Sequence, residues 1–314
     1  MSPIKRAFSR LAAAFLSLPL RFKITLPYLV VAILLAGLAT WVITQSFARG
    51  LQERFNARLV DGFVSASDAV FQSESGYLTS ERAMARTAGM AVAVGAHDTQ
   101  AAADLVRPLA VNAGLPLVHV VDTSGRLIYG LRTTAAGEIE NETAEFNTWP
   151  LLQRVLAGES DQLGDKYSSV VDTPWGPALY VAGPVKEGEQ LRGAVLVGAP
   201  LHEILPQMRS DSLARVTIYS PGGEPVATAF DPSASVPPLA ADAQAVLNTV
   251  GGRTLYNRLF GAGPDEYGEA VGPLFLRGQA TGWAIGVALP RSLLTESAQF
   301  SPLQLALVLG KNLT

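Results

Sequence analysis

A long uncharged stretch near the N-terminus constrains this chain more than any other feature. No charged side chain occurs between Lys23 and Arg49, and Ile24–Ile43 reads ITLPYLVVAILLAGLATWVI. At about 1.5 Å per residue, a helix of this length crosses a hydrocarbon layer roughly 30 Å thick. The sequence therefore predicts a transmembrane helix over residues 24–45. A cleaved signal peptide is the alternative, but the apolar run is long for that role and Ser46-Phe47-Ala48 is a poor cleavage motif.

The charges around this stretch predict its orientation. Residues 1–23 contain five bases and no acids. Because Lys and Arg are retained on the cytoplasmic side, we expect a cytoplasmic N-terminus at the inner (cell) membrane and an extracytoplasmic remainder. That remainder carries 27 acids against 19 bases, and nucleic-acid recognition needs clustered positive charge, so no nucleic-acid partner is expected. The lack of cysteine excludes disulfides and thiolate metal sites.

Helical periodicity continues beyond the apolar stretch and predicts a stalk helix over residues 46–94. This segment contains no proline. Apolar side chains recur in it mostly at four-residue spacing, at Phe47, Leu51, Phe55, Leu59, Phe63 and Val70. Such a stripe is typical of an amphipathic helix. The stripe either packs on the chain's own domain or forms the seam of a parallel homodimer, and both can hold along different stretches.

The pattern then changes to strands. A hairpin is predicted over residues 117–121 and 127–131, around the turn Asp122–Gly125, because Asp and Gly accept turn geometry. A short helix over 149–158 and strands at 167–171, 178–185 and 191–197 follow. The same order recurs from Arg215, with a second hairpin around Ser220–Gly223 and a closing strand ending at Pro290. The sequence therefore predicts an α+β fold.

The repeat predicts two tandem modules with antiparallel sheets, over residues 95–209 and 210–299. Residues 300–314 form an apolar segment that stops too early to span a membrane. We expect this segment to be the start of a truncated second transmembrane helix, and a bare C-terminal helix is the alternative.

This organisation resembles that of the double Cache sensor domains of bacterial transmembrane receptors. The resemblance is carried by the stalk 46–94, the turn Asp122–Gly125, Gly176–Val185, Gly193–Gly198 and Trp283–Pro290. It implies a PAS-like, six-stranded type of sheet in each module, a small ligand in the membrane-distal module (95–209), and a dimer along the long helices. Output would come from a kinase, cyclase, phosphodiesterase or chemotaxis domain that this sequence does not contain.

One branch of that family binds amino acids through a pattern that this sequence does not match. The pattern includes Tyr-x-Asp, and here Ser169 stands two positions after Tyr167. The resemblance therefore gives no support for an amino acid as the ligand.

The sequence contains no constellation typical of an active site. His97, His119 and His202 lack metal-ligand spacing, and neither a Gly-x-Ser-x-Gly elbow nor a phosphate-binding Gly-Lys-Ser/Thr loop occurs. We therefore expect no enzyme activity, no cofactor and no metal site.

The membrane-distal module offers material for a ligand pocket, namely aromatic side chains that exclude water and charged groups that fix orientation. The predicted ligand-binding residues are Tyr129, Arg132, Trp149, Asp165, Lys166, Tyr167, Trp175 and Tyr180. A weaker set in the membrane-proximal module is Tyr256, Arg258, Tyr267 and Phe275. For each of these residues the alternative is an ordinary core side chain or an exposed loop charge.

Together these features predict the extracytoplasmic ligand-sensing input region of a membrane signalling receptor, dimeric through its stalk. The alternative is a membrane-tethered interaction domain that binds another protein and no small ligand. A distal module filled by its own aromatic side chains would favour that alternative.

Overall fold

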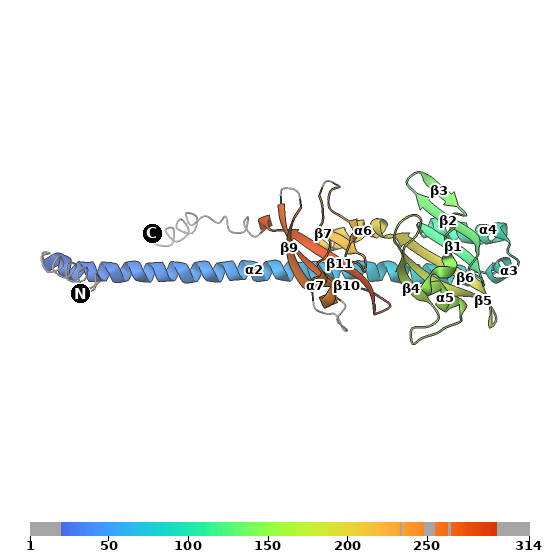
Figure 1. Ribbon diagram of the computed structural model, residues 1–314, viewed down its shortest axis with the longest axis horizontal. Coiled ribbons are helices and arrows are strands. Elements are labelled where there is room, and N and C mark those ends of the chain that lie inside the picture. Colours follow the sequence, from blue (N-terminus) through green and yellow to red (C-terminus); the bar gives the residue numbers. More distant parts are fainter. Residues whose placement is uncertain (1–19, 233, 248–254, 263–264, 294–314) are drawn as a thin grey trace. The chain divides into compact units, whose positions relative to one another are not determined.

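The computed structural model describes residues 20–232, 234–247, 255–262 and 265–293 (Figure 1). By its contacts the chain divides into two units, residues 1–56 and 57–314. Most of the predicted cytoplasmic segment 1–23, and all of the predicted second membrane segment 300–314, lie outside the described residues.

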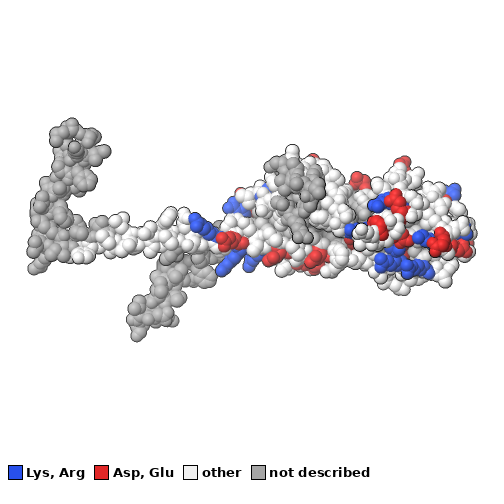
Figure 2. Space-filling model, turned by 90° about the horizontal axis from the view of Figure 1, so that it is seen from below, with Lys and Arg blue, Asp and Glu red and all other residues white. Residues whose placement is uncertain are grey.

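A single helix, α2, runs from Leu20 to Ala85. Between Lys23 and Arg49, side chains such as Leu29, Leu34 and Trp41 are exposed, and this part of the helix is white in Figure 2 because it carries no charged side chain. Among the described residues, no helix has the length and hydropathy needed to cross a membrane.

The predicted stalk helix ends earlier than residue 94. Gly89 adopts φ 92°, and the separate helix α3 (Met90–Gly95) begins after it. A right-handed helix requires negative φ at every position, so the stretch 86–89 interrupts the periodicity that the apolar pattern alone suggested.

The first sheet has six antiparallel strands in the order β3-β2-β1-β6-β5-β4. The strands are β1 (Leu117–Asp122), β2 (Leu127–Thr134), β3 (Gly137–Glu140), β4 (Tyr167–Val171), β5 (Ala178–Glu187) and β6 (Gln190–Pro200). Helix α4 (Thr99–Asn112), the 3-10 turn η1 (Phe146–Thr148) and helix α5 (Pro150–Leu156) accompany them.

The second sheet has five antiparallel strands in the order β8-β7-β11-β10-β9. The strands are β7 (Arg215–Tyr219), β8 (Pro225–Thr228), β9 (Tyr256–Ala262), β10 (Asp265–Leu276) and β11 (Gln279–Pro290). Helix α6 (Leu201–Ser212) precedes this sheet, and α7 (Ala241–Leu247) follows β8.

The predicted α+β class, the two antiparallel sheets and both hairpins are confirmed. The repeat is also visible in the strand order, because β2-β1-β6-β5-β4 corresponds to β8-β7-β11-β10-β9. The second sheet differs from the six-stranded type, since its described residues form no counterpart of β3. Strand β3 itself was not predicted, because all four of its residues are exposed and show no apolar alternation.

The sheets lie within residues 95–209 and 210–299, which we call the first and second module. The module boundaries themselves stay predictions.

The first sheet is covered on both faces, which explains why all of β1 is buried. Val118 and Val120 pack with the end of α2, α3 and α4, on what we call the helix face. Leu117 and Val121 point the other way and pack with η1 and α5, on the pocket face. Alternation along β1 therefore separates two hydrophobic clusters.

Between residues 57 and 85, helix α2 packs against both sheets of its unit. Leu59 and Val70 are buried, and the ring of Phe63 lies so close to Gly272 of β10 that no larger residue fits there. The predicted stripe in this part of the helix therefore packs on its own domain. A different face leaves Val60, Val64 and Phe71 exposed, with Phe71 at 64%.

Glu81 of α2 is a buried carboxyl group beneath β5. It is 0% exposed, and neither oxygen has a hydrogen-bond partner among the described residues. Gly183 leaves the space that the carboxyl group occupies. Burial raises the pKa of Glu81 to about 7, although the nearby Lys166 opposes the rise.

We predict that Glu81→Gln removes a pH dependence of stability. A carboxyl group whose pKa rises on folding, from 4.5 to about 7, favours the folded state in acid, and that contribution is lost as the pH rises from 4.5 through 7. The variant should therefore be more stable than the parent at pH 8, by up to roughly 3 kcal/mol, and nearly equal to it at pH 4.5. Unfolding midpoints at the two pH values measure this difference.

Asp68→Asn is the matched control, because Asp68 is exposed on the same helix. An equal effect of Glu81→Gln at both pH values would contradict a raised pKa.

Candidate functional site

The pocket face of the first sheet carries an aromatic cluster, defined here as His119, Phe146, Trp149, Trp175 and Tyr180. The His119 ring stacks on Trp175 with centroids 5.5 Å apart and lies 4.9 Å from Phe146. Trp149 lies 4.8 Å from Phe146 and 5.0 Å from Tyr180. These separations are typical of directly interacting rings.

Two strands, two turns and a loop bring the cluster together. His119 comes from β1, Tyr180 from β5 and Phe146 from η1. Trp149 precedes α5 directly as its N-terminal capping residue, and Trp175 lies between β4 and β5.

Glycines on neighbouring strands make room for two of these rings. Gly130 lies opposite His119, and a Cβ atom there would be 3.0 Å from its ring. Gly198 lies opposite Tyr180, and a Cβ atom there would be 2.9 Å from the tyrosine ring. A side chain at Gly130 would press on the His119 ring, whereas one at Gly198 would clash first with the carbonyl oxygen of Leu179 and also with the Tyr180 ring.

The interior of the cluster is uncharged. His119 is 1% exposed, and its burial, together with the nearby Arg132, lowers its pKa to about 3, so the imidazole is neutral. Its Nδ1 lies 3.4 Å from the Tyr180 hydroxyl, and burial raises the pKa of Tyr180 well above 10. The rings thus form a neutral wall.

An ion pair stands at the edge of this wall. Arg132 of β2 bonds to Glu142 and places its guanidinium carbon 5.7 Å from the Trp175 ring centre. Both side chains remain partly exposed. A cavity of about 470 Å³ also adjoins the cluster, since Phe146 lines it together with Leu127 and Arg126.

The structure brings four of the predicted residues together: Arg132, Trp149, Trp175 and Tyr180. Tyr167 belongs to the same hydrophobic cluster of the pocket face, where Arg154 lies over its ring at 4.0 Å.

The other three predicted residues lie elsewhere. Tyr129 packs on the helix face, because strand alternation sends it and Arg132 to opposite sides of β2. Asp165 bonds to Lys166 at 2.8 Å and to Lys186 at 2.9 Å. These charges line a separate cavity of about 440 Å³ beside the end of α2.

The residues that the sequence analysis missed are His119, Phe146 and Glu142. His119 is the only polar residue within Leu117–Val121, and it was considered only as a metal ligand. A single histidine inside an otherwise apolar strand was the sequence feature that could have indicated a buried ring at this position. Phe146 and Glu142 lie in an irregular polar stretch that has no periodicity to reveal them.

In the second module a satisfied polar network occupies the corresponding face. Arg258 of β9 donates to Glu269 at 2.6 Å and to the Tyr219 hydroxyl at 2.7 Å, and Tyr219 donates to Glu269 at 2.8 Å. Arg258 also bonds to the carbonyl oxygens of Pro237 and Pro238. Of the weaker candidates, Arg258 thus fixes the core and Tyr267 packs in it. Tyr256 lies against the core, and Phe275 is 42% exposed.

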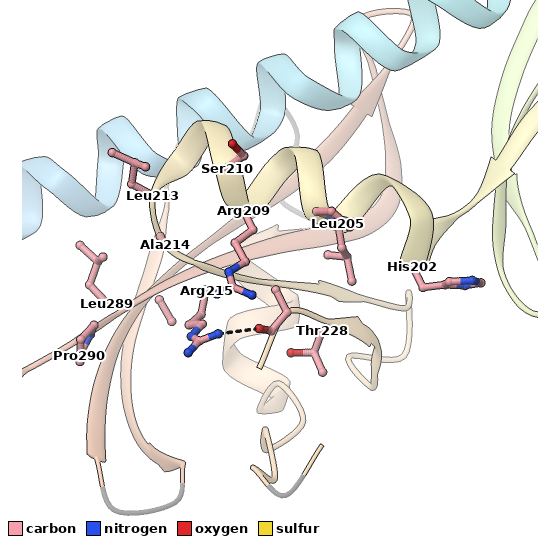
Figure 3. Close-up of a pocket in the computed structure, with 13 residues that line it drawn as sticks. His202, Leu205, Arg209, Ser210, Leu213, Ala214, Arg215, Thr228, Leu289 and Pro290 are labelled. Carbon is pink, nitrogen blue, oxygen red and sulfur yellow. Dashed lines mark hydrogen bonds between the residues drawn. The ribbon is translucent and has the colours of Figure 1, made fainter. Parts of the chain in front are cut away.

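A hollow of about 770 Å³ lies between α6 and the second sheet (Figure 3). Arg209 of α6 and Arg215 of β7 extend into it, and Arg215 bonds to the carbonyl oxygen of Ala229 at 3.1 Å. Leu213, at its rim, is 86% exposed. No acidic residue belongs to the described lining.

Comparison with known proteins identifies a family. A family model described as the double sensory domain of two-component sensor kinase, dCache_3, matches residues 52–290. No curated protein matches the chain.

Solved structures share the fold at low sequence identity. The ligand-binding domain of the Campylobacter jejuni chemoreceptor Tlp3, in complex with L-valine, is 11% identical with a TM-score of 0.52, over 79% of this chain and 97% of that domain. The same receptor's sensory domain with isoleucine bound is 10% identical with a TM-score of 0.50, over 79% and 97%. The extracellular domain of vpHK1S-Z8, described as a histidine kinase, is 8% identical with a TM-score of 0.56, over 83% and 99%.

We predict that His119→Phe protects the fold against acid. A histidine whose pKa falls on folding, from 6.5 to about 3, contributes stability above pH 6.5 that is lost as the pH falls toward 3. Phenylalanine keeps the ring and cannot take up a proton. The variant should therefore gain up to roughly 3 kcal/mol relative to the parent between pH 7.5 and pH 4.5, measured by urea unfolding.

The control is His202→Phe, since His202 is exposed. If His119→Phe and His202→Phe change the free energy of unfolding at pH 4.5 equally, then the cluster does not hold His119 neutral.

Proposed function

Because this chain belongs to the dCache_3 family of double sensory domains of two-component sensor kinases, we propose that it is the extracytoplasmic input region of a membrane signalling receptor, and that its first module binds a small molecule. Cache sensory domains are ligand-binding input domains and not catalytic ones. The proposed role is therefore to convert ligand binding into a conformational change of α2.

The aromatic cluster is the observation that carries this proposal. Its neutral rings can exclude water from the apolar part of a ligand, and the Arg132–Glu142 pair can orient a charged group at the edge. The adjoining cavity beside Phe146 provides room. We therefore propose a small, partly apolar ligand with at least one charged group.

Tlp3 binds L-valine and isoleucine in structures of similar fold. Ser169 stands where the amino-acid-binding branch of double Cache domains has Asp, so this chain lacks one carboxylate of that pattern. Amino acids are therefore one class to test among others.

The membrane anchor is part of the proposal. It is supported by the uncharged run between Lys23 and Arg49, by the basic segment before it, and by the exposed apolar side chains of α2 such as Leu34 and Leu38. With this anchor the N-terminus is cytoplasmic and both modules lie outside the inner membrane.

The homodimer is also a proposal, and its seam differs from the predicted stripe. Leu59 is buried within its own chain, whereas Val60, Val64 and Phe71 expose apolar surface on another face of the same helix. Their spacing places them on one side of a helix, as a pairing seam requires.

A second candidate function is binding of a protein partner without a small ligand. Two observations favour it: the aromatic side chains already fill much of the pocket face, and the hollow in Figure 3 combines two arginines with the exposed Leu213. A partner that presents an acidic group beside an apolar side chain would fit this hollow.

We predict that at least one small molecule raises the thermal stability of residues 48–299. The screen covers amino acids, carboxylates, amines, purines and sugars. A ligand at a hundred times its dissociation constant that binds only the folded state should stabilise the protein by roughly 2.7 kcal/mol.

Trp149→Ala should abolish the stabilisation by the ligand. Trp283→Ala is the control and should leave it intact, because Trp283 is a buried tryptophan of the second module. No shift with any compound would favour the protein-partner function instead.

We predict disulfide formation across a dimer from single cysteines at Val60, Val64 and Phe71 of the full chain. The chain has no native cysteine to interfere. Leu59→Cys is the control, because its side chain is buried in its own chain and should cross-link little. The dimer seam would be wrong if none of the three exposed positions cross-links, or if Leu59→Cys does so equally.

A further inference from the structure

The tip of the β10–β11 hairpin contacts the first module through the side chain of Arg277. Leu276 pairs with Gln279, so the loop consists of Arg277 and Gly278. Nη2 of Arg277 donates to Asp161 at 2.6 Å, and the guanidinium carbon lies 4.7 Å from the Tyr167 ring centre. The arginine side chain is only 10% exposed. The second module thus places a largely buried cation against the first.

The backbone of the same residue is bound to α2. The Arg277 N–H donates to both carboxylate oxygens of Glu74, at 3.0 and 3.2 Å. Glu74 is buried and also accepts a hydrogen bond from the hydroxyl of Ser168, the residue after Tyr167. One carboxylate of α2 therefore holds the hairpin and β4 together.

The turn itself does not call for an arginine. Arg277 has φ 49° and Gly278 has φ 71°, and a two-residue hairpin loop with positive φ at both positions favours Asn-Gly. The equivalent loop of the first sheet is Gly188–Glu189, where glycine takes the first position. A long side chain at positive φ is sterically unfavourable, so the contacts of Arg277 with the first module account for its presence better than the turn does.

Tyr167 connects this arginine to the aromatic cluster. Its ring is also covered by Arg154 of α5, at 4.0 Å, and α5 begins at the residue after Trp149. A movement of Trp149 therefore moves the helix whose arginine rests on Tyr167. Cation–π contacts of this kind are stronger when water is excluded.

We propose that Arg277 is a positioning residue that couples the two modules, so that a displacement of the aromatic cluster passes through Tyr167 to the β10–β11 hairpin and to Glu74 of α2. The proposal rests on the proposed function for what displaces the cluster, but the coupling itself exists without a ligand. By reciprocity, loosening either end of the contact loosens the other.

The test is hydrogen exchange of the full chain without any ligand. Arg277→Asn keeps the turn and the backbone bond to Glu74 but removes the guanidinium. Exchange should become at least about fivefold faster at residues 150–156 and 167–171 of the first module, and stay unchanged at 256–262 of the second. Arg291→Asn is the control, because Arg291 pairs with Glu266 at the other end of the same two strands. It should change neither region of the first module.

The reverse direction uses Tyr167. Tyr167→Leu should accelerate exchange at residues 274–282, whereas Tyr167→Phe should not, because the Tyr167 hydroxyl has no hydrogen-bond partner among the described residues. Arg277→Lys keeps the charge without the planar stack and should give a smaller acceleration at 150–156 and 167–171 than Arg277→Asn.

Unchanged exchange in the first module of Arg277→Asn, or equal effects of Tyr167→Leu and Tyr167→Phe, would overturn the coupling. Because no ligand is added, failure of the ligand screen leaves this result unaffected, and failure here leaves ligand binding in the first module standing.

Discussion

The packing of both sheets depends on the buried face of α2 between Leu59 and Met84. Its side chains pack against both sheets, through Phe63 at the second and through Met84 at the first. Each sheet buries part of its apolar surface against α2, and neither sheet could bury that surface without this helix. Glu74, between these two contacts, adds a polar junction, because donors from both modules stabilise its buried carboxylate. Both modules therefore contact one common element, helix α2.

The two modules use the same strand order for different chemistry. On the first sheet, neutral rings surround His119, and the Arg132–Glu142 ion pair stands at the edge of these rings. On the second sheet, Arg258 and Glu269 neutralise each other inside the core, and Arg258 also donates to a backbone carbonyl oxygen. A core that already satisfies its own charges has little to gain from a ligand, because binding would break bonds that exist. This difference supports the proposal that the ligand binds in the first module.

The sensory role follows from family membership, whereas the site comes from geometry alone. Similar folds at 8 to 11% identity say little about which ligand fits, because a pocket is defined by side chains and those have diverged. The chemical class proposed for the ligand therefore depends on the rings and the ion pair of this chain. Basic and acidic residues are interspersed on the face shown in Figure 2, whereas a nucleic-acid-binding surface needs clustered basic residues.

The sequence by itself determined the α+β class, the hairpins and their repetition, because apolar alternation and turn residues such as Asp122 and Gly125 act over a few neighbouring positions. It also named Arg132, Trp149, Trp175 and Tyr180, which the structure brings together at the pocket face. Only the tertiary structure decided that Tyr129 lies on the far face, that His119 stacks on Trp175, and that Arg277 rests on Tyr167. Those contacts join residues far apart in the chain, and packing, which no local pattern encodes, sets which of them meet.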